Sequence, residues 1–191
     1  MPNFPWQVEM ARKPELHDRS AIVAGKALDL SEELTPVSMK NAVRSSGANS
    51  LSTRVVLAAS PDLTDVMPGM PLMEAASRHR GVLIIEADIP LYALVFDDII
   101  ENLERLVPDI EAAAPGLAYV GIWGLEGLYG DDAHVVRLLA SAIDNFDLRI
   151  GVGDNKWLAY AASLLSRSNS GRKVTGEHGR FLDRFPVDSL P

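Results

Sequence analysis

Hydrophobic and polar positions along the chain form short blocks that predict helices and strands in turn. The clearest pattern predicts a helix over Pro90–Leu106, where apolar residues recur every three or four positions. Its apolar stripe is Tyr92, Val95, Phe96, Ile99, Leu103 and Leu106. A second amphipathic helix is predicted from an aspartate cap, Asp131 or Asp132, to Phe146. Its inward positions are Val135, Leu138, Leu139, Ala142 and Phe146.

The remaining elements follow from short apolar runs between turn-forming residues. Strands are predicted at Ser20–Ala24, Thr53–Ala59, Gly81–Glu86, Leu117–Trp123, Leu148–Val152 and Arg172–Thr175. Helices are predicted at Val8–Leu16 with a break at Pro14, after Gly69-Met-Pro71 and at Lys156–Ser166, with helical turns after Ser60 and over Phe181–Phe185. Residues 26–52 are rich in Ser, Asn and Glu without sustained periodicity, which predicts a flexible insertion.

From Val82 to Thr175 the predicted order is β-α-β-α-β-α-β. This order favours an α+β fold, with a mixed or antiparallel sheet and helices on one face, as in ferredoxin-like domains. Periodicity alone leaves a doubly wound parallel sheet open.

Composition excludes several classes of protein. The 191 residues are enough for one sizeable domain or two small ones. There is no cysteine, so disulfides and cysteine zinc sites are excluded. No apolar run reaches the roughly 20 residues of a membrane span, and the first residues lack the basic and apolar regions of a signal peptide, so we expect a protein of a bacterial-type cytoplasm, at most associated with the nucleoid.

Charge is unevenly distributed. The net charge is −8, which argues against a dedicated nucleic-acid coat. The stretch from Lys156 to Arg184 is nevertheless net +4. It contains the candidate phosphate contacts Lys156, Arg167, Arg172 and Lys173. A solvated surface explains these cations equally well.

The run from Gly151 to Ser163 predicts a strand end, a glycine turn, a polar cap and a helix that opens with Lys156. An ammonium at the mouth of such a turn suits a phosphate group. An ordinary first-turn lysine on a surface helix is the structural alternative.

Several motifs, in order, resemble those of Y-family (translesion) DNA polymerases. Besides the run that contains Asn155-Lys156, they are Val8–Leu16, Ser20–Gly25, Val55–Ser60, Gly69-Met-Pro71, the predicted hairpin Gly124–Gly130 and Phe181–Pro191. The resemblance implies a fingers-like subdomain over residues 5–77 and a palm-like domain over 78–191. We expect the thumb and little finger to be absent.

The same resemblance places the family's metal-binding carboxylates at positions that lack them here. Glu111–Tyr119 aligns with the family's central strand, and its Asp and Glu fall on Gly116 and Leu117. The first-strand Asp falls at about Pro2. We therefore expect no catalysis and no Mg²⁺ cofactor, with Mg²⁺ only if other acids replace the lost ones.

Other candidate groups have plainer explanations. The family's triphosphate-binding Tyr and Arg give way to Ser60–Asp65, whose two aspartates would repel phosphate. Glu86, Asp88, Asp97 and Asp98 are candidates for a relocated metal site, although a helix cap at Asp88 and a solvated helix side at Asp97 and Asp98 account for them. The histidines (17, 79, 134 and 178) show no ligand spacing, and Trp123, Trp157 and Tyr160 fit a core or interface better than base stacking.

The pattern is most similar to the catalytically degenerate ImuB-type members of the Y family. This resemblance implies an adaptor that binds protein partners of the translesion and replication machinery, with weak DNA contact at most and no membrane. One alternative is a metal-dependent nucleotidyltransferase that uses relocated acids. Another is a shortened remnant that only self-associates, because an incomplete first strand would leave a sheet edge open for a homo-oligomer.

Overall fold

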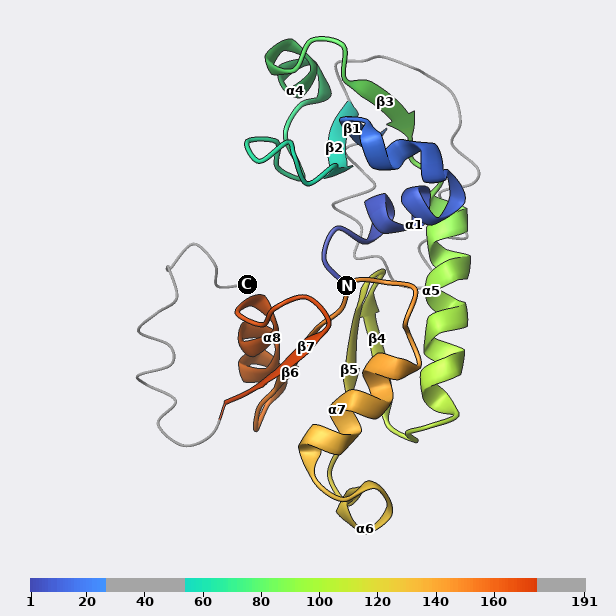
Figure 1. Ribbon diagram of the computed structural model, residues 1–191, viewed down its shortest axis with the longest axis vertical. Helices are drawn as coiled ribbons and strands as arrows, with labels where there is room; N and C mark the ends of the chain where they lie inside the picture. Colours follow the sequence, from blue (N-terminus) through green and yellow to red (C-terminus); the bar gives the residue numbers. More distant parts are fainter. Residues whose placement is uncertain (27–53, 175–191) are drawn as a thin grey trace. The chain divides into compact units, whose positions relative to one another are not determined.

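The computed structural model describes residues 1–26 and 54–174, shown in Figure 1. The chain divides into two units, Met1–Val120 and Gly121–Pro191. The predicted boundary between residues 77 and 78 stays a prediction. The predicted insertion, apart from Lys26, and the motif at Phe181–Pro191 lie outside the described residues.

The first unit is built around a mixed three-stranded sheet in the order β2-β1-β3. Its strands are β1 (Ala21–Lys26), β2 (Arg54–Ala59) and β3 (Leu83–Glu86). The central strand β1 runs antiparallel to β2 and parallel to β3. One cluster of buried side chains packs on this sheet and on α4 (Leu72–Arg78): Ile22, Ala24, Val56, Ala59, Leu63, Val66, Leu72 and Ala75. These strands confirm the three predicted for this part of the chain.

Helix α1 (Phe4–Arg12) and the 3-10 turn η1 (Pro14–Asp18) replace the predicted helix at Val8–Leu16. The helix starts earlier than predicted because Pro5 occupies its first turn, where a missing N–H costs nothing. Its buried face carries Phe4, Trp6, Val8 and Glu9.

The long helix α5 (Ile89–Glu104) confirms the strongest prediction from the sequence. Tyr92, Phe96, Ile99 and Leu103 are its buried residues. Asp88 caps the helix by accepting a hydrogen bond from the Leu91 N–H at 3.2 Å. Helix α5 holds α1 through the edge-to-face pair Phe4–Phe96, whose ring centroids are 5.7 Å apart.

A hairpin of β4 (Ile110–Ala114) and β5 (Leu117–Val120) completes the first unit. Strand β5 corresponds to the predicted strand Leu117–Trp123 but ends three residues earlier. Strand β4 was not predicted, because after Ile110 its sequence, Glu-Ala-Ala-Ala, has none of the β-branched and aromatic residues typical of strands.

The second unit contains a two-stranded parallel sheet and its helices. Its elements are α6 (Glu126–Tyr129), α7 (Asp132–Ser141), β6 (Arg149–Val152), α8 (Lys156–Leu164) and β7 (Ser170–Lys173). The predicted hairpin at Gly124–Gly130 is wrong, since a single helical turn, α6, occupies this segment. Helix α7 ends at Ser141 rather than Phe146, although its predicted cap is confirmed: Asp131 accepts a hydrogen bond from the His134 N–H at 2.8 Å.

The predicted α+β fold is confirmed by these mixed sheets and their covering helices. No helix within residues 1–26 and 54–174 is sufficiently long and apolar to span a bilayer.

Candidate functional site

The turn between β4 and β5 holds the positions at which the sequence predicts lost carboxylates. Gly116 is buried and has φ +87°, a left-handed conformation that favours glycine. A Cβ built on Gly116 would lie 2.6 Å from Phe4 Cβ and 3.0 Å from the Met1 carbonyl oxygen. The backbone nitrogen of Met1 donates a hydrogen bond to the Gly116 carbonyl at 2.6 Å. This turn is therefore packed directly against the start of the chain.

These positions do not fit a divalent metal. Mg²⁺ requires oxygen ligands, usually carboxylates, and Pro2, Gly116 and Leu117 offer no side-chain oxygen. A carboxylate at position 116 would need both a strained backbone and space that Phe4 already fills. Elsewhere in the described part of the chain, no three His, Asp or Glu side chains lie together as a metal site would require.

The acids considered for a relocated site are not brought together. Glu86 forms an ion pair with Arg54, and Asp88 pairs with Arg12 at 3.2 Å while it caps α5. Asp97 and Asp98 are exposed on α5, as expected for a solvated helix side.

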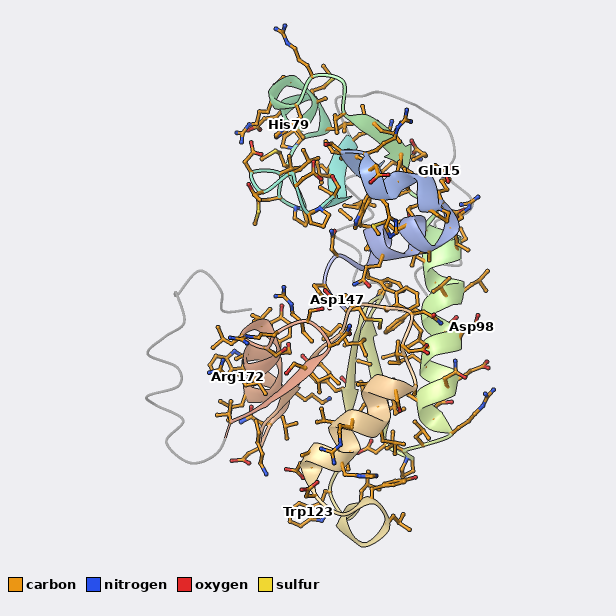
Figure 2. The ribbon with its side chains drawn as sticks, in the orientation of Figure 1. Glu15, His79, Asp98, Trp123, Asp147 and Arg172 are labelled. Atoms are coloured by element: carbon orange, nitrogen blue, oxygen red, sulfur yellow. The ribbon has the colours of Figure 1, made fainter. Side chains whose placement is uncertain are left out.

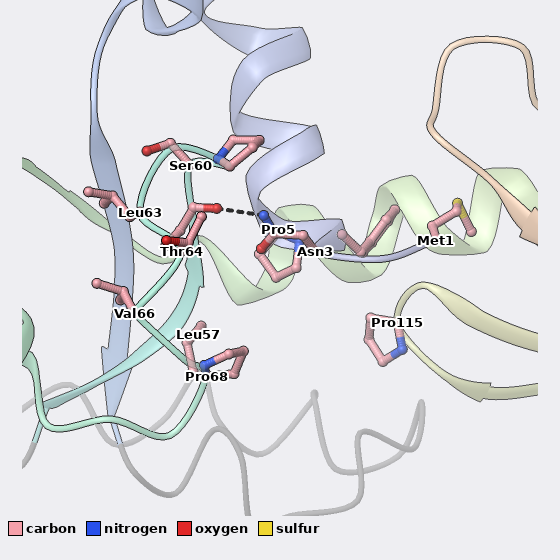
Figure 3. A pocket seen from close by; sticks show the side chains of 13 residues that line it. Met1, Asn3, Pro5, Leu57, Ser60, Leu63, Thr64, Val66, Pro68 and Pro115 are labelled. Carbon is pink, nitrogen blue, oxygen red and sulfur yellow. Dashed lines mark hydrogen bonds between the residues drawn. The ribbon is translucent and has the colours of Figure 1, made fainter. Parts of the chain in front are cut away.

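A pocket of about 450 Å³ lies beside the β4–β5 turn in the first unit (Figure 3). Apolar residues and four prolines form most of its wall, and no charged side chain is among the residues that line it. The lining residues are Met1, Asn3, Phe4, Pro5, Leu57, Ala59, Ser60, Pro61, Leu63, Thr64, Val66, Pro68 and Pro115. Its polar groups are partly used: the Asn3 amide donates to the Ala59 carbonyl at 2.5 Å, and the Ser60 hydroxyl accepts from the Ala21 N–H at 3.0 Å.

The two aspartates after Ser60 do not line this pocket. Asp62 accepts a hydrogen bond from the Ser20 hydroxyl at 2.5 Å, which lowers the pKa of the Asp62 carboxyl. Asp65 lies 2.7 Å from the His79 ring nitrogen, and this hydrogen bond lowers the pKa of the Asp65 carboxyl. Both acids therefore form hydrogen bonds with other surface residues of the first unit.

The strand–turn–helix that contains Lys156 has the predicted local structure. The Asn155 side chain caps α8 by accepting a hydrogen bond from the Leu158 N–H at 2.9 Å. A Cβ at Gly151 would lie 1.9 Å from the Ala159 carbonyl oxygen, and one at Gly153 would lie 2.8 Å from the Ala159 nitrogen. Both glycines therefore allow α8 to pack closely on β6. Lys156 is exposed at the first position of the helix.

Two of the four candidate phosphate contacts have partners within the second unit. Lys173 pairs with Asp132 of α7, and this hydrogen bond raises the pKa of the Lys173 ammonium. Arg172, labelled in Figure 2, donates a hydrogen bond to the Leu165 carbonyl at 3.1 Å. Arg167 is exposed between α8 and β7. Whether any of these residues binds phosphate stays a prediction.

Trp123, predicted to lie in a core or an interface, is 95% exposed beside α6, where Leu128 is also exposed (Figure 2). Trp157 and Tyr160 on α8 are partly buried. A core position is therefore excluded for Trp123, and an interface position stays a prediction.

Comparison with known proteins connects these features to a family. The sequence model of the impB/mucB/samB family matches residues 1–164. DNA polymerase IV of Dehalococcoides mccartyi strain CBDB1 is 26% identical over 190 residues, which are 96% of this chain and 43% of that protein. DNA polymerase IV of Caulobacter vibrioides is 28% identical over 127 residues, 64% of this chain and 32% of that protein.

Solved structures share the fold at low sequence identity. The post-insertion binary complex of Dbh DNA polymerase matches with a TM-score of 0.73 and 19% identity, covering 100% of this chain and 51% of that one. DinB from Sulfolobus solfataricus matches with a TM-score of 0.73 and 19% identity, covering 99% and 51%. The chain thus spans between about a third and a half of the length of these proteins.

Proposed function

Since the chain belongs to the impB/mucB/samB family, we propose that it is a non-catalytic relative of the Y-family DNA polymerases that acts in DNA repair and translesion synthesis. The family match and the polymerase fold of its structural relatives support the link to this process. Within the family we assign it to the ImuB type, in which a palm and fingers region serves as an adaptor.

The packing of Gly116 is the observation that best supports the proposed absence of catalysis. Its left-handed backbone, and the 2.6 Å between a Cβ built on it and Phe4 Cβ, leave no room for the metal-binding Asp that the resemblance places there. Polymerases of this kind need carboxylates to hold the two metal ions that align the primer hydroxyl and the triphosphate. The residues that line the pocket beside the turn also include no Lys or Arg that would hold a triphosphate.

Protein contacts account better than DNA contacts for the exposed groups. Trp123 and Leu128 are exposed in a segment, residues 121–132, whose sequence contains no Lys or Arg. An exposed aromatic and aliphatic pair without a cation in its own segment suits a protein partner of the translesion or replication machinery better than the DNA backbone. DNA contact is weak and limited to exposed cations such as Lys156.

A second candidate function is a metal-dependent nucleotidyltransferase that uses relocated acids. The relatives named DNA polymerase IV favour it. Against it, Glu86 and Asp88 are each held in an ion pair with an arginine.

Primer extension tests the two candidates. The purified chain, at high concentration with Mg²⁺ or Mn²⁺ and all four dNTPs, is expected to add no nucleotide. Calorimetric titration with Mg²⁺ and a dNTP is likewise expected to release no metal-dependent heat.

Variants separate activity of the chain from a contaminant. Extension that stops on chelation, survives repurification and falls in the E86Q or D97N/D98N variant would establish catalysis by relocated acids. Extension that is unchanged in these variants would come from a contaminating polymerase or from acids outside this set, and a final repurification distinguishes the two.

A further inference from the structure

Gly116 is one of the positive-φ glycines of the first unit, and it is confined by rigid neighbours. Its closest atoms are Phe4 Cβ at 2.6 Å from the built Cβ and the Met1 carbonyl oxygen at 3.0 Å. Neither atom is the far end of a flexible side chain, so neither moves away at low cost. A side chain at position 116 requires the start of α1 to shift.

Phe4 cannot retreat easily. It is 2% exposed, and its ring packs edge-to-face on Phe96 of α5. Farther along the same helix, Glu9 is 1% exposed and accepts a hydrogen bond from the Tyr92 hydroxyl at 3.0 Å, also on α5. Helix α1 is therefore anchored to α5 at two points, and the β4–β5 turn packs against a fixed helix.

Gly81 provides an internal comparison for the same backbone conformation. It has φ +83°, nearly the value at Gly116, but a Cβ built on it meets nothing within 4 Å. Replacing Gly81 thus measures the strain of the left-handed backbone alone, whereas replacing Gly116 adds the clash with Phe4.

We propose that the β4–β5 turn has become a packing joint for α1, so that restoring Asp at 116 and Glu at 117 does not restore a divalent-cation site. This inference rests on the proposed function, because it takes the metal-binding carboxylates at these positions to be lost. It explains why they could not be regained one residue at a time. A carboxylate placed at Gly116 must first displace Phe4 from its contact with α5. The turn now contributes to the fold of the first unit rather than to chemistry.

Thermal unfolding of the full chain tests the packing joint. We expect G81A to lower Tm by roughly 3 °C, the effect of backbone strain, and G116A to lower it by roughly 10 °C. The double variant G116D/L117E is expected to lower Tm well beyond the matched double variant G81D/L117E. If G116D/L117E fails to fold while G81D/L117E folds, the loss is located at position 116 and supports the inference. Equal losses at positions 81 and 116 would overturn it.

Binding of Mn²⁺, followed by electron paramagnetic resonance, tests the metal site itself. We expect the wild type, L117E and any folded G116D/L117E to show the same weak Mn²⁺ binding. A gain of tenfold or more in G116D/L117E, with Tm near that of G81D/L117E, would overturn the inference. Such a gain leaves the proposed function standing, because that proposal concerns the wild type and fails only if the wild type itself extends primers.

Discussion

Two glycine-containing turns in this chain lie at motif positions of one family, and they differ in how far they keep the residues of the motif. At β6–α8, Gly151 and Asn155 match the polymerase signature, and each has a structural role in the packing or capping of α8. At β4–β5, the turn departs from the signature, and Gly116 packs on Phe4. The fold explains the retained glycine and asparagine, whereas the altered turn is where we propose that metal-binding groups are missing. A signature match can therefore establish a fold without establishing an activity.

The largest test of this comparison is Gly151→Ala. The added Cβ would lie 1.9 Å from the Ala159 carbonyl oxygen, so α8 must move off β6. We expect a loss of about 3 kcal/mol or more in the free energy of unfolding, measured by urea denaturation. Gly127→Ala is the matched control, because a Cβ there meets nothing within 4 Å, and it is expected to be neutral or slightly stabilising. A G151A variant as stable as G127A would remove the structural explanation of the motif.

A smaller effect is expected at the second anchor of α1. Tyr92→Phe removes the hydrogen bond to the buried Glu9 carboxylate, which should cost about 1–3 kcal/mol by urea denaturation. Tyr160→Phe, at a partly buried tyrosine of the other unit, is the control and should cost less than about 1 kcal/mol.

The pH dependence of Tyr92 has a definite sign. Burial, and then the neighbouring Glu9 carboxylate, raise the pKa of the Tyr92 phenol, so the folded protein holds this proton more tightly than the unfolded chain. The corresponding stability is complete below the unfolded pKa of about 10 and is lost as the pH rises above it. Y92F should therefore lose stability less steeply than the wild type above pH 10, and equal slopes would contradict this account.

The smallest expected effect concerns the cation of the retained motif. Lys156→Ala should change stability by less than about 0.5 kcal/mol, because the residue is exposed. If Lys156 contacts phosphate, fluorescence anisotropy with single-stranded DNA at low salt should show weakening of roughly two- to fivefold. Lys173→Ala is the matched control, because it removes the same charge from the second unit. The Lys173 ammonium is paired with Asp132, and this pairing raises its pKa. Equal DNA affinity in K156A and the wild type would leave the motif with a structural role only.

The sequence predicted best where a periodic pattern coincides with burial. The apolar stripe of α5 from Tyr92 to Leu103 is the clearest case, and the caps Asp131 and Asn155 were also predicted correctly. The α+β fold follows from such elements in order, and the family follows from motifs that resemble those of the Y family; the fold and the family are confirmed.

The remaining features depend on tertiary structure. The alanines of β4 have no strong strand preference, and pairing with β5 makes them a strand. The contact between Gly116 and Phe4 joins residues more than 100 positions apart, so no local pattern reveals it. The pairing of Lys173 with Asp132 likewise depends on α7 lying against β7.

The register of β1 and β2 has a consequence for chain length. Lys26 and Arg54 are direct partners in the ladder, so β1 ends and β2 begins at adjacent positions. Because each doubling of a loop costs only about 0.6 kcal/mol in closure entropy, evolution or an engineer can lengthen or shorten this connection while both strands keep their pairing. A tag or a second domain inserted there would leave the sheet intact.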